Sequence, residues 1–243
     1  MSCLKTQSQT MALLSVMLLS VAGALAQTPP CNTGLQPPAG VCTNPDDPAA
    51  LLNSPKTGLN SAGGSTLDPN WQIAVPYPSA PSNRPHSRPV TDPCSLKKFE
   101  PAWVDLPDAA WLVNDAVSDW ITPQIESSLG GYYIYRTSFN PGSNVYMDYL
   151  GQETSDNETE SIYLDVPVNP VIPSGCFLLQ GPPVNCPGCF NSWTPITVTN
   201  QPVAPGLKNY LYFVVRNRGV HGVDQSPTDT GLRVEFSSVI FHN

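Results

Sequence analysis

The clearest pattern in the chain is a strict alternation of side chains between residues 131 and 139, in the stretch GYYIYRTSF. One face of this stretch carries Tyr133, Tyr135, Thr137 and Phe139, and the opposite face carries Tyr132, Ile134, Arg136 and Ser138. A period of two over this length is typical of a β-strand whose two faces meet different surroundings. We therefore expect a strand at 131–139.

Shorter apolar, β-branched and aromatic runs follow, with turn residues between them. The expected strands cover residues 70–74, 111–113, 120–121, 144–150, 161–166, 193–199, 209–217 and 231–241. A long polar loop, 217–230, lies between the last two, and Pro141-Gly142 suggests a hairpin turn before 144–150. Only 108–120 has helical spacing, for a turn or two at most. The pattern predicts an all-β protein, an antiparallel β-sandwich.

Prolines are concentrated in the first half of the chain, where 16 of the 28 lie between residues 29 and 107. Because proline has no amide hydrogen to donate, we expect loops and edge strands in this half. Residues 27–62 also lack apolar periodicity, which predicts a Pro/Gly/Ser-rich arm or linker. The β-sandwich binding domain is expected to occupy residues 63–243.

The N-terminal segment has the features of a signal peptide. A segment with one charge, Lys5, precedes an apolar run that ends in Ala24-Leu25-Ala26. The run is short for a membrane span, and signal peptidase accepts the small residues at its end. We predict that residues 1–26 are removed and that the protein is secreted, to the extracellular space or cell wall, without membrane insertion.

The charge balance limits the partners. Without Lys5 the expected mature chain has 10 of the 11 basic residues and all 19 acidic residues, a net charge of −9. An acidic chain of this kind argues against nucleic acid and anionic membrane surfaces.

The expected mature chain keeps six of the seven cysteines, namely Cys31, Cys42, Cys94, Cys176, Cys186 and Cys189. An even number in an oxidising compartment predicts three disulfides, so the domain is expected to be disulfide-stapled. A local Cys31–Cys42 bond is the first expectation. Cys186 then pairs with Cys189, or both cross over to Cys94 and Cys176. A redox site is disfavoured at the Cys186-Pro-Gly-Cys189 stretch because no strand–helix pattern surrounds it.

Five stretches together resemble the galactose-binding-like jelly roll found in carbohydrate-binding modules of secreted proteins. They are GYYIYRTSF, SDNETESIYLDV, CFNSWTPITVT, GLKNYLYFVVRN and TGLRVEF, between Asp68 and Phe241. Two departures stand out: Asp165-Val166-Pro167-Val168 replaces an Asn-Gly turn, and the next connection is lengthened and carries three cysteines. The resemblance implies a jelly roll with a binding role and no particular sugar.

Catalytic patterns are weak in this chain. The histidines are His86, His221 and His242, no Gly-x-Ser-x-Gly elbow occurs, and no two acids form a recognisable glycosidase pair. We expect a protein without enzyme activity and without a required cofactor. That the protein is a glycoside hydrolase is the less favoured interpretation.

Sugar binding requires aromatic rings that stack on pyranose faces and planar polar groups that hydrogen-bond hydroxyls. Aromatic residues expected at strand ends are the candidate platforms, and the polar candidates lie in and beside the 217–230 loop. These ligand-binding candidates are Trp71, Trp120, Tyr132, Trp193, Arg216, Asn217, His221 and Asp224.

The stretch Asn157-Glu158-Thr159 is a glycosylation sequon, which predicts a surface turn at Asn157. Asp156, Glu158 and Glu160 alternate beside it and are weak candidates for a structural calcium. The function that the sequence favours is a carbohydrate-binding or extracellular recognition module, with a polysaccharide or glycoprotein glycan as partner. The alternative is a structural protein of the cell wall or extracellular matrix, and the oligomeric state is open.

Overall fold

The computed structural model describes residues 66–74, 90–105, 109–115, 117–123, 128–181, 189–218 and 228–243, which all belong to one compact unit, Cys31–Asn243. Within them lie the strands β1 (Thr66–Ala74), β2 (Phe99–Asp105), β3 (Trp120–Thr122), β4 (Gly131–Phe139), β5 (Tyr146–Asp156), β6 (Glu158–Val166), β7 (Gly175–Gln180), β8 (Thr194–Pro202), β9 (Asn209–Asn217) and β10 (Gly231–His242). Two 3-10 turns complete them, η1 (Pro93–Ser95) and η2 (Cys189–Asn191). No helix in these ranges has the length and apolarity to cross a membrane.

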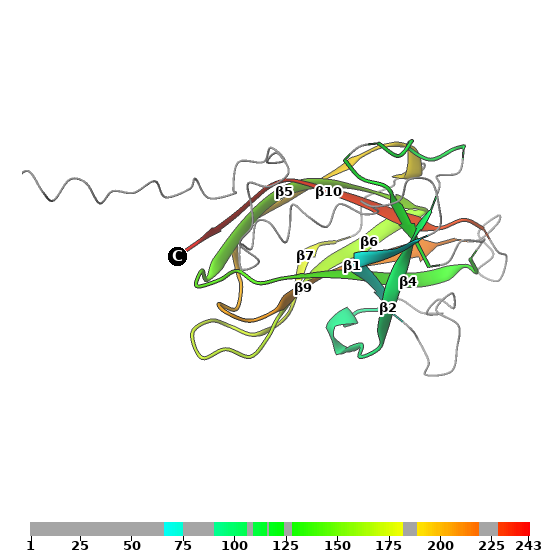
Figure 1. Ribbon diagram of the computed structural model, residues 1–243. Coiled ribbons are helices and arrows are strands. Elements are labelled where there is room, and N and C mark those ends of the chain that lie inside the picture. The colour runs from blue at the N-terminus through cyan, green and yellow to red at the C-terminus, as the bar shows by residue number, and fades with distance from the viewer. Residues whose placement is uncertain are drawn as a thin grey trace, which may run out of the picture. The chain divides into compact units, whose positions relative to one another are not determined.

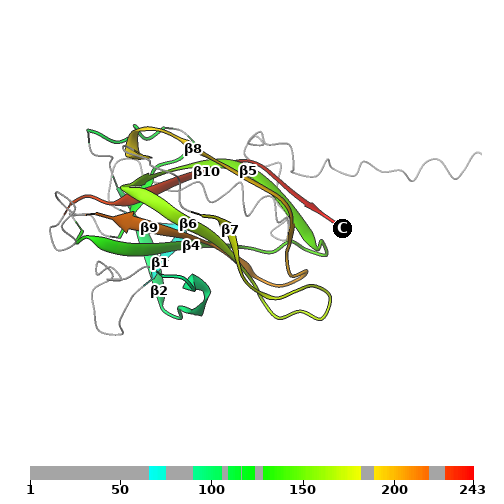
Figure 2. The same ribbon diagram turned by 180° about the vertical axis from the view of Figure 1, so that it is seen from behind.

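The strands form a single antiparallel sheet in the order β7-β6-β9-β4-β1-β2-β3-β10-β5-β8. The sheet curls so that β5, β8 and β10 lie in one layer and β4, β6 and β9 in the other (Figures 1 and 2). Apolar and aromatic side chains from both layers fill the space between them, among them Trp71, Tyr135, Phe213 and Val234. The predicted all-β, antiparallel fold is confirmed.

The alternating stretch behaves as its pattern predicts. β4 has the predicted bounds, and β9 also spans 209–217 as expected. Tyr133, Tyr135 and Phe139 point into the core between the layers, whereas Tyr132 and Ile134 belong to a second apolar cluster on the outer face. This assigns the face that carries Arg136 to the outside of the sheet.

Three local expectations are wrong. Residues 111–113 form no strand, and neither 109–115 nor 117–120 contains a helix. The turn at Pro141-Gly142 is present, but it makes no hairpin, since β4 pairs with β1 and β9 while β5 pairs with β8 and β10. The chain instead crosses there from one layer to the other. Turn chemistry is local, and it does not specify which strands then pair.

The proline-rich half also contributes more than edge strands. β1 carries Pro69 and β2 carries Pro101, yet both strands lie inside the sheet order. Pro69 falls where the β1–β2 register shifts, between Leu67 and Gln72. Pro101 pairs with Gln72 at the end of the β1–β2 ladder, next to the same register shift, and lies outside the pairing of β2 with β3, which starts at Trp103. Neither proline therefore interrupts a continuous ladder.

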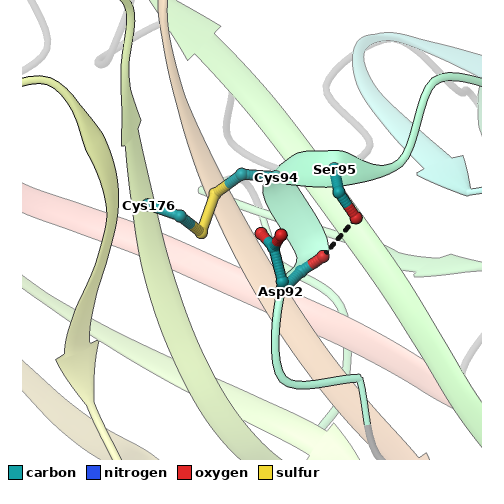
Figure 3. Close-up of a disulfide and its surroundings, with 4 residues drawn as sticks. All are labelled: Asp92, Cys94, Ser95 and Cys176. Atoms are coloured by element: carbon teal, nitrogen blue, oxygen red, sulfur yellow. Dashed lines mark hydrogen bonds between the residues drawn. A yellow bond between two sulfur atoms is a disulfide. The ribbon is translucent and has the colours of Figure 1, made fainter.

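A disulfide joins Cys94 in η1 to Cys176 in β7, across 82 residues of sequence (Figure 3). The predicted disulfide stapling is thus confirmed at this bond, and the crossover of these two cysteines to Cys186 and Cys189 is wrong. Cys189 is disulfide-bonded as well. Cys31, Cys42 and Cys186 lie outside the described residues. The Cys94–Cys176 bond holds the η1 segment against the layer that contains β6 and β9.

Candidate functional site

The outer face of β4, β9 and β6 is the strongest candidate for a binding surface. Registers across these strands place Tyr163, Tyr212 and Arg136 in one row, and Asp165, Tyr210 and Ser138 in the next. Of the three tyrosines, Tyr163 and Tyr210 are partly exposed and Tyr212 is buried. The rows bring aromatic rings, a guanidinium and a carboxylate together on the outer face of this layer.

Arg136 is held at the centre of this face. Its guanidinium carbon lies 3.5 Å from the centre of the Phe99 ring and 4.6 Å from that of Tyr210. Its Nε donates to Oε1 of Gln72 at 2.9 Å, and the side chain lies close enough to Tyr212 to oppose the rise that burial causes in the pKa of that tyrosine. Stacking between two rings fixes the plane of a guanidinium and favours the charge. Arg136 is therefore preorganised while it stays partly exposed. We name Phe99, Arg136, Tyr163, Asp165 and Tyr210 the aromatic shelf.

Charged groups border the aromatic shelf. Burial raises the pKa of Asp165, and the nearby Lys97 and Arg136 oppose this shift. Lys97 itself is exposed and lies just past η1, a turn that packs on β6 and β9. The shelf thus offers both hydrogen-bond donors and a carboxylate acceptor beside its rings.

Two of the sequence-predicted platforms are unsuitable because they are buried. Trp71 is 0% exposed and packs on Phe213 in the core. Trp120 is also 0% exposed, and its ring centre lies 4.3 Å from that of Trp111. The Trp111 and Trp120 rings both lie against Gly231, where a Cβ atom would stand 3.0 Å from each of them. The expectation that these tryptophans face a ligand is wrong, since the sequence pattern does not distinguish a strand-end aromatic from a core one.

The two indole nitrogens of this pair have partners inside the protein. Trp120 Nε1 donates to the carbonyl of Leu112 at 2.8 Å, and Trp111 Nε1 donates to Oδ2 of Asp156 at 2.8 Å. A buried indole with a satisfied N–H is a stable core residue. The Trp111–Trp120 pair therefore serves the fold.

The other two aromatic candidates lie on opposite layers. Tyr132 is buried on the outer face of β4, with the guanidinium of Arg216 5.7 Å from its ring centre. Trp193 is partly exposed just before β8, and Arg233 lies 4.8 Å from its ring centre. Each of these rings is already engaged by an arginine of the protein, and the two do not share a site.

The candidates at the 217–230 loop that the structure describes, Arg216 and Asn217, do not form a shared binding site. Arg216 pairs with Glu160 at 3.6 Å. Asn217 is buried and its amide donates to the carbonyls of Ser128 and Leu129, so it anchors the base of the loop. An anchored amide of this kind is a structural group, which corrects its expected role in binding. His221 and Asp224 lie outside the described residues.

The calcium candidates have other partners. Both Oε atoms of Glu158 contact the guanidinium of Arg218, at 2.6–3.1 Å, while Glu160 pairs with Arg216 and Asp156 accepts from Trp111. Hydrogen bonds to Glu158 raise the pKa of Arg218. In the described ranges these three carboxylates form no group with metal-ligand spacing. The structure therefore does not support a calcium site here.

The described residues bring together one other set of possible metal ligands, Asp92, Cys94 and Cys176. Figure 3 shows the Asp92 carboxylate beside the bond between the two sulfurs. A disulfide offers no thiolate, and metal ions bind cysteine as thiolate. This group is therefore a disulfide with a neighbouring acid.

Asn157 forms the corner between β5 and β6, where the chain passes from one layer to the other. Its side chain is partly exposed, its Oδ1 accepts from the amide of Arg218, and its own amide donates to the carbonyl of Arg216. The predicted surface turn is present. Glycosylation of the Nδ2 atom stays a prediction.

Sequence reasoning missed the aromatic shelf, although one signal pointed to it. Arg136 stands among aromatic residues in a strand of strict alternation, on the face opposite the core residues. A charge in such a position must either reach solvent or find partners on the sheet surface. Phe99 and Asp165 gave no comparable signal, because their approach to Arg136 depends on where β2 and β6 lie in the sheet.

Comparison with protein-family models, with curated proteins and with solved structures finds no match for this chain.

Proposed function

We propose that the protein is a secreted, non-catalytic carbohydrate-binding module of the galactose-binding-like jelly-roll type, and that it binds glycans on the aromatic shelf. The observation that carries this proposal is the Arg136 guanidinium held between Phe99 and Tyr210, with Tyr163 and Asp165 in adjoining rows. Stacking rings beside planar hydrogen-bonding groups suit the two faces of a sugar, which is apolar on its C–H side and polar at its edge.

The path of the chain supports the jelly-roll assignment. The chain changes layer between β4 and β5 and again between β5 and β6, β7 and β8, β8 and β9, and β9 and β10. Repeated crossing between two antiparallel layers is the way jelly rolls are wound. Secretion is supported by the N-terminal sequence and by the Cys94–Cys176 disulfide, because disulfides persist in oxidising compartments.

A binding role is favoured over glycoside hydrolysis by the position of Glu153. Burial raises the pKa of this carboxyl to about 7, a value suited to a general acid. However, Glu153 is 1% exposed and points between the layers, away from the aromatic shelf. A polymeric substrate on the surface cannot reach it.

The experiment is a pull-down of the mature protein on a panel of insoluble and immobilised polysaccharides, with the variants Tyr210→Ala and Tyr146→Ala. Tyr146 is a matched control, because it is also a partly exposed tyrosine on a strand, on β5 in the other layer, and stacks on His242. We expect retention on at least one polysaccharide and its loss in Tyr210→Ala alone. Retention on none of the panel, or equal loss in both variants, would refute the proposal.

A further inference from the structure

A short segment of the chain, residues 90–98, lies over the outer face of the layer that contains β4 and β9. It includes η1, which packs on β6 and β9, and it ends where β2 begins at Phe99. Its side chains Val90, Cys94 and Leu96 are partly buried and pack on the outer apolar cluster, whereas the polar residues between them are exposed. We name residues 90–98 the strap.

The outer apolar cluster is well covered for side chains on the outside of a sheet. Ile134, Tyr212 and Val214 point away from the core between the layers, yet they are 0%, 1% and 1% exposed. A sheet face without a second layer on it ordinarily leaves its side chains open to solvent. Here the described apolar residues that pack on the cluster come from the strap and from the aromatic shelf. Tyr212 lies between Arg136 and Tyr163 in one cross-strand row, so the covered ring is continuous with the shelf.

The hydrogen bonds described for the strap stay within it. The amide and the hydroxyl of Ser95 donate to the carbonyl of Asp92, and the amide of Leu96 donates to that of Pro93 (Figure 3). Attachment to the sheet rests on apolar contacts, mostly of partly exposed side chains, and on the covalent bond to Cys176. A partly exposed apolar side chain gains only part of the free energy of a fully buried one. The disulfide is therefore the main fastening of the strap.

The two cysteines of this disulfide are partly exposed, so a thiol can reach the bond. A thiolate of a dithiol attacks one sulfur, which breaks the Cys94–Cys176 bond, forms a mixed disulfide and leaves the other cysteine as a thiolate. The second thiol of the reagent then displaces the first cysteine. The dithiol ends as a disulfide, its two protons pass to the cysteines, and Cys94 and Cys176 end as two thiols.

We propose that the Cys94–Cys176 bond is a redox-operated fastening: in oxidising surroundings the strap is closed over the outer apolar cluster, and exchange with a dithiol releases the strap and opens this part of the face. Release uncovers the ring of Tyr212 and makes the row from Arg136 to Tyr163 continuous. The domain stays folded, because β7 keeps its pairing with β6 and the core between the layers contains no residue of the strap.

The test compares the mature wild type with the double variant Cys94→Ser/Cys176→Ser and with Leu96→Ser, which keeps the disulfide and loses an apolar contact of the strap. We expect the backbone NMR order parameters of the strap to fall from about 0.85 to below about 0.6 in the double variant and to stay near the wild-type value in Leu96→Ser. Relaxation of the Tyr212 ring by a soluble paramagnetic agent should increase in the double variant alone. A rigid strap in the double variant, or equal release in Leu96→Ser, would overturn the proposal.

A second measurement uses the unaltered protein and dithiothreitol, a dithiol. Because this reagent also reaches other disulfides, the double variant receives the same treatment as the control. The strap of the wild type should become mobile, the strap of the double variant should stay as it was, and unchanged signals from β5 and β10 should report an intact fold. A strap that stays rigid while mass spectrometry shows Cys94 and Cys176 reduced would refute the proposal as well.

The consequence for ligand binding rests on the function proposed above, whereas the release of the strap does not. On the polysaccharide that retains the wild type, the double variant should bind about two- to tenfold more tightly, because Tyr212 then adds a stacking ring. Unchanged or weaker binding by a variant with a released strap would show that the strap does not limit the binding surface. Retention of neither protein, with the strap released, would refute the glycan-binding function and leave the redox-operated fastening standing.

Discussion

Two arginines on the outer faces of the two layers have opposite surroundings. Arg233 on β10 has a side chain that is 1% exposed, and its N–H groups are hydrogen-bonded inside the protein. Its partners are Ser118 Oγ at 2.6 Å, the Val113 carbonyl at 2.7 Å, Asp115 Oδ2 at 2.8 Å and Glu235 Oε1 at 3.2 Å. Arg136 on β4 stays partly exposed, and its Nε donates to Oε1 of Gln72.

The difference shows how the same residue type can serve the fold or a ligand. The partners of Arg233 are Val113, Asp115 and Ser118, which lie outside the strands, and Glu235 on β10, so the arginine fastens irregular parts of the chain onto the sheet. Arg136 is fixed by the faces of two rings, which orient the guanidinium and leave its edge less occupied. A saturated arginine stabilises the structure, and an oriented, partly exposed one is available for recognition.

The largest expected effect is on Arg233. Arg233→Ala leaves the carboxylate of Glu235 and the hydroxyl of Ser118 without their buried partner, and removal of one member of a buried ion pair costs about 3–5 kcal/mol. We expect a loss of this size in the free energy of unfolding, measured by urea denaturation. Arg233→Lys should lose less, since it keeps the charge. A loss below about 1 kcal/mol in Arg233→Ala would contradict a structural role.

The next largest effect concerns the Cys94–Cys176 disulfide. It holds η1 on the layer that carries the aromatic shelf, as the Arg233 contacts hold the chain around Val113 and Ser118 on the other layer. Replacement of both Cys94 and Cys176 by serine removes a cross-link over 82 residues. We expect the free energy of unfolding to fall by about 2–4 kcal/mol. Urea denaturation under oxidising conditions measures this, and the wild type with reductant gives the comparison. An unchanged stability would show that η1 is held by packing alone.

Arg136→Ala should cost less stability and more binding. The stacking on Phe99 and Tyr210 is at a partly exposed site, where such contacts are worth about 0.5–1 kcal/mol. We expect unfolding to change by about this amount, while affinity for the retained polysaccharide drops about tenfold or more. Affinity gel electrophoresis and urea denaturation of the same preparation separate the two effects. A large stability loss with unchanged affinity would reverse the assignment of the two arginines.

The smallest effect is a difference in the pKa of two aspartates. Burial raises the pKa of Asp115, but hydrogen bonds from the Val117 and Ser118 amides and the charge of Arg233 bring it below 3.8 overall. Burial keeps the pKa of Asp165, beside Arg136, above 3.8. Asp115 therefore stabilises the fold above pH 3.8 and loses this effect as the pH falls through its lowered pKa, whereas the ionisation of Asp165 disfavours the fold as the pH rises.

Carboxyl NMR titration of the folded protein checks this pair directly, with Asp165→Asn and Asp115→Asn to assign the signals. The expected order is Asp115 first and Asp165 later as the pH rises. The reverse order would contradict the assignment of Asp115 to a site where amide hydrogen bonds and Arg233 favour the charged form, and of Asp165 to one where burial prevails.

The sequence predicted the sheet better than the site, for a physical reason. Alternation in 131–139 reports directly which side chains share a face, and that is a local property. Partners across the sheet depend on the strand order, and the turn at Pro141-Gly142 shows that local chemistry does not reveal it. The aromatic shelf depends on that order because Phe99, Arg136 and Asp165 come from different strands.

The burial of individual aromatic residues was the second property that the sequence did not predict. Trp120 and Tyr210 are both aromatic residues near strand ends, and the sequence contains nothing that marks the first as fully buried and the second as partly exposed. The difference arises because residues 109–115 and 117–119 lie beside β3 and β10, where Arg233 and the Trp111–Trp120 pair hold them. Irregular segments of this kind have no periodic signature.

The most direct test of the account is to map amide chemical shifts while an oligosaccharide of the retained polysaccharide is added to the labelled protein. The account predicts changes at residues 134–138, 161–165 and 210–214, which surround Arg136, and none around Arg233 at residues 113–119 and 231–235. Changes confined to the Arg233 region would contradict it.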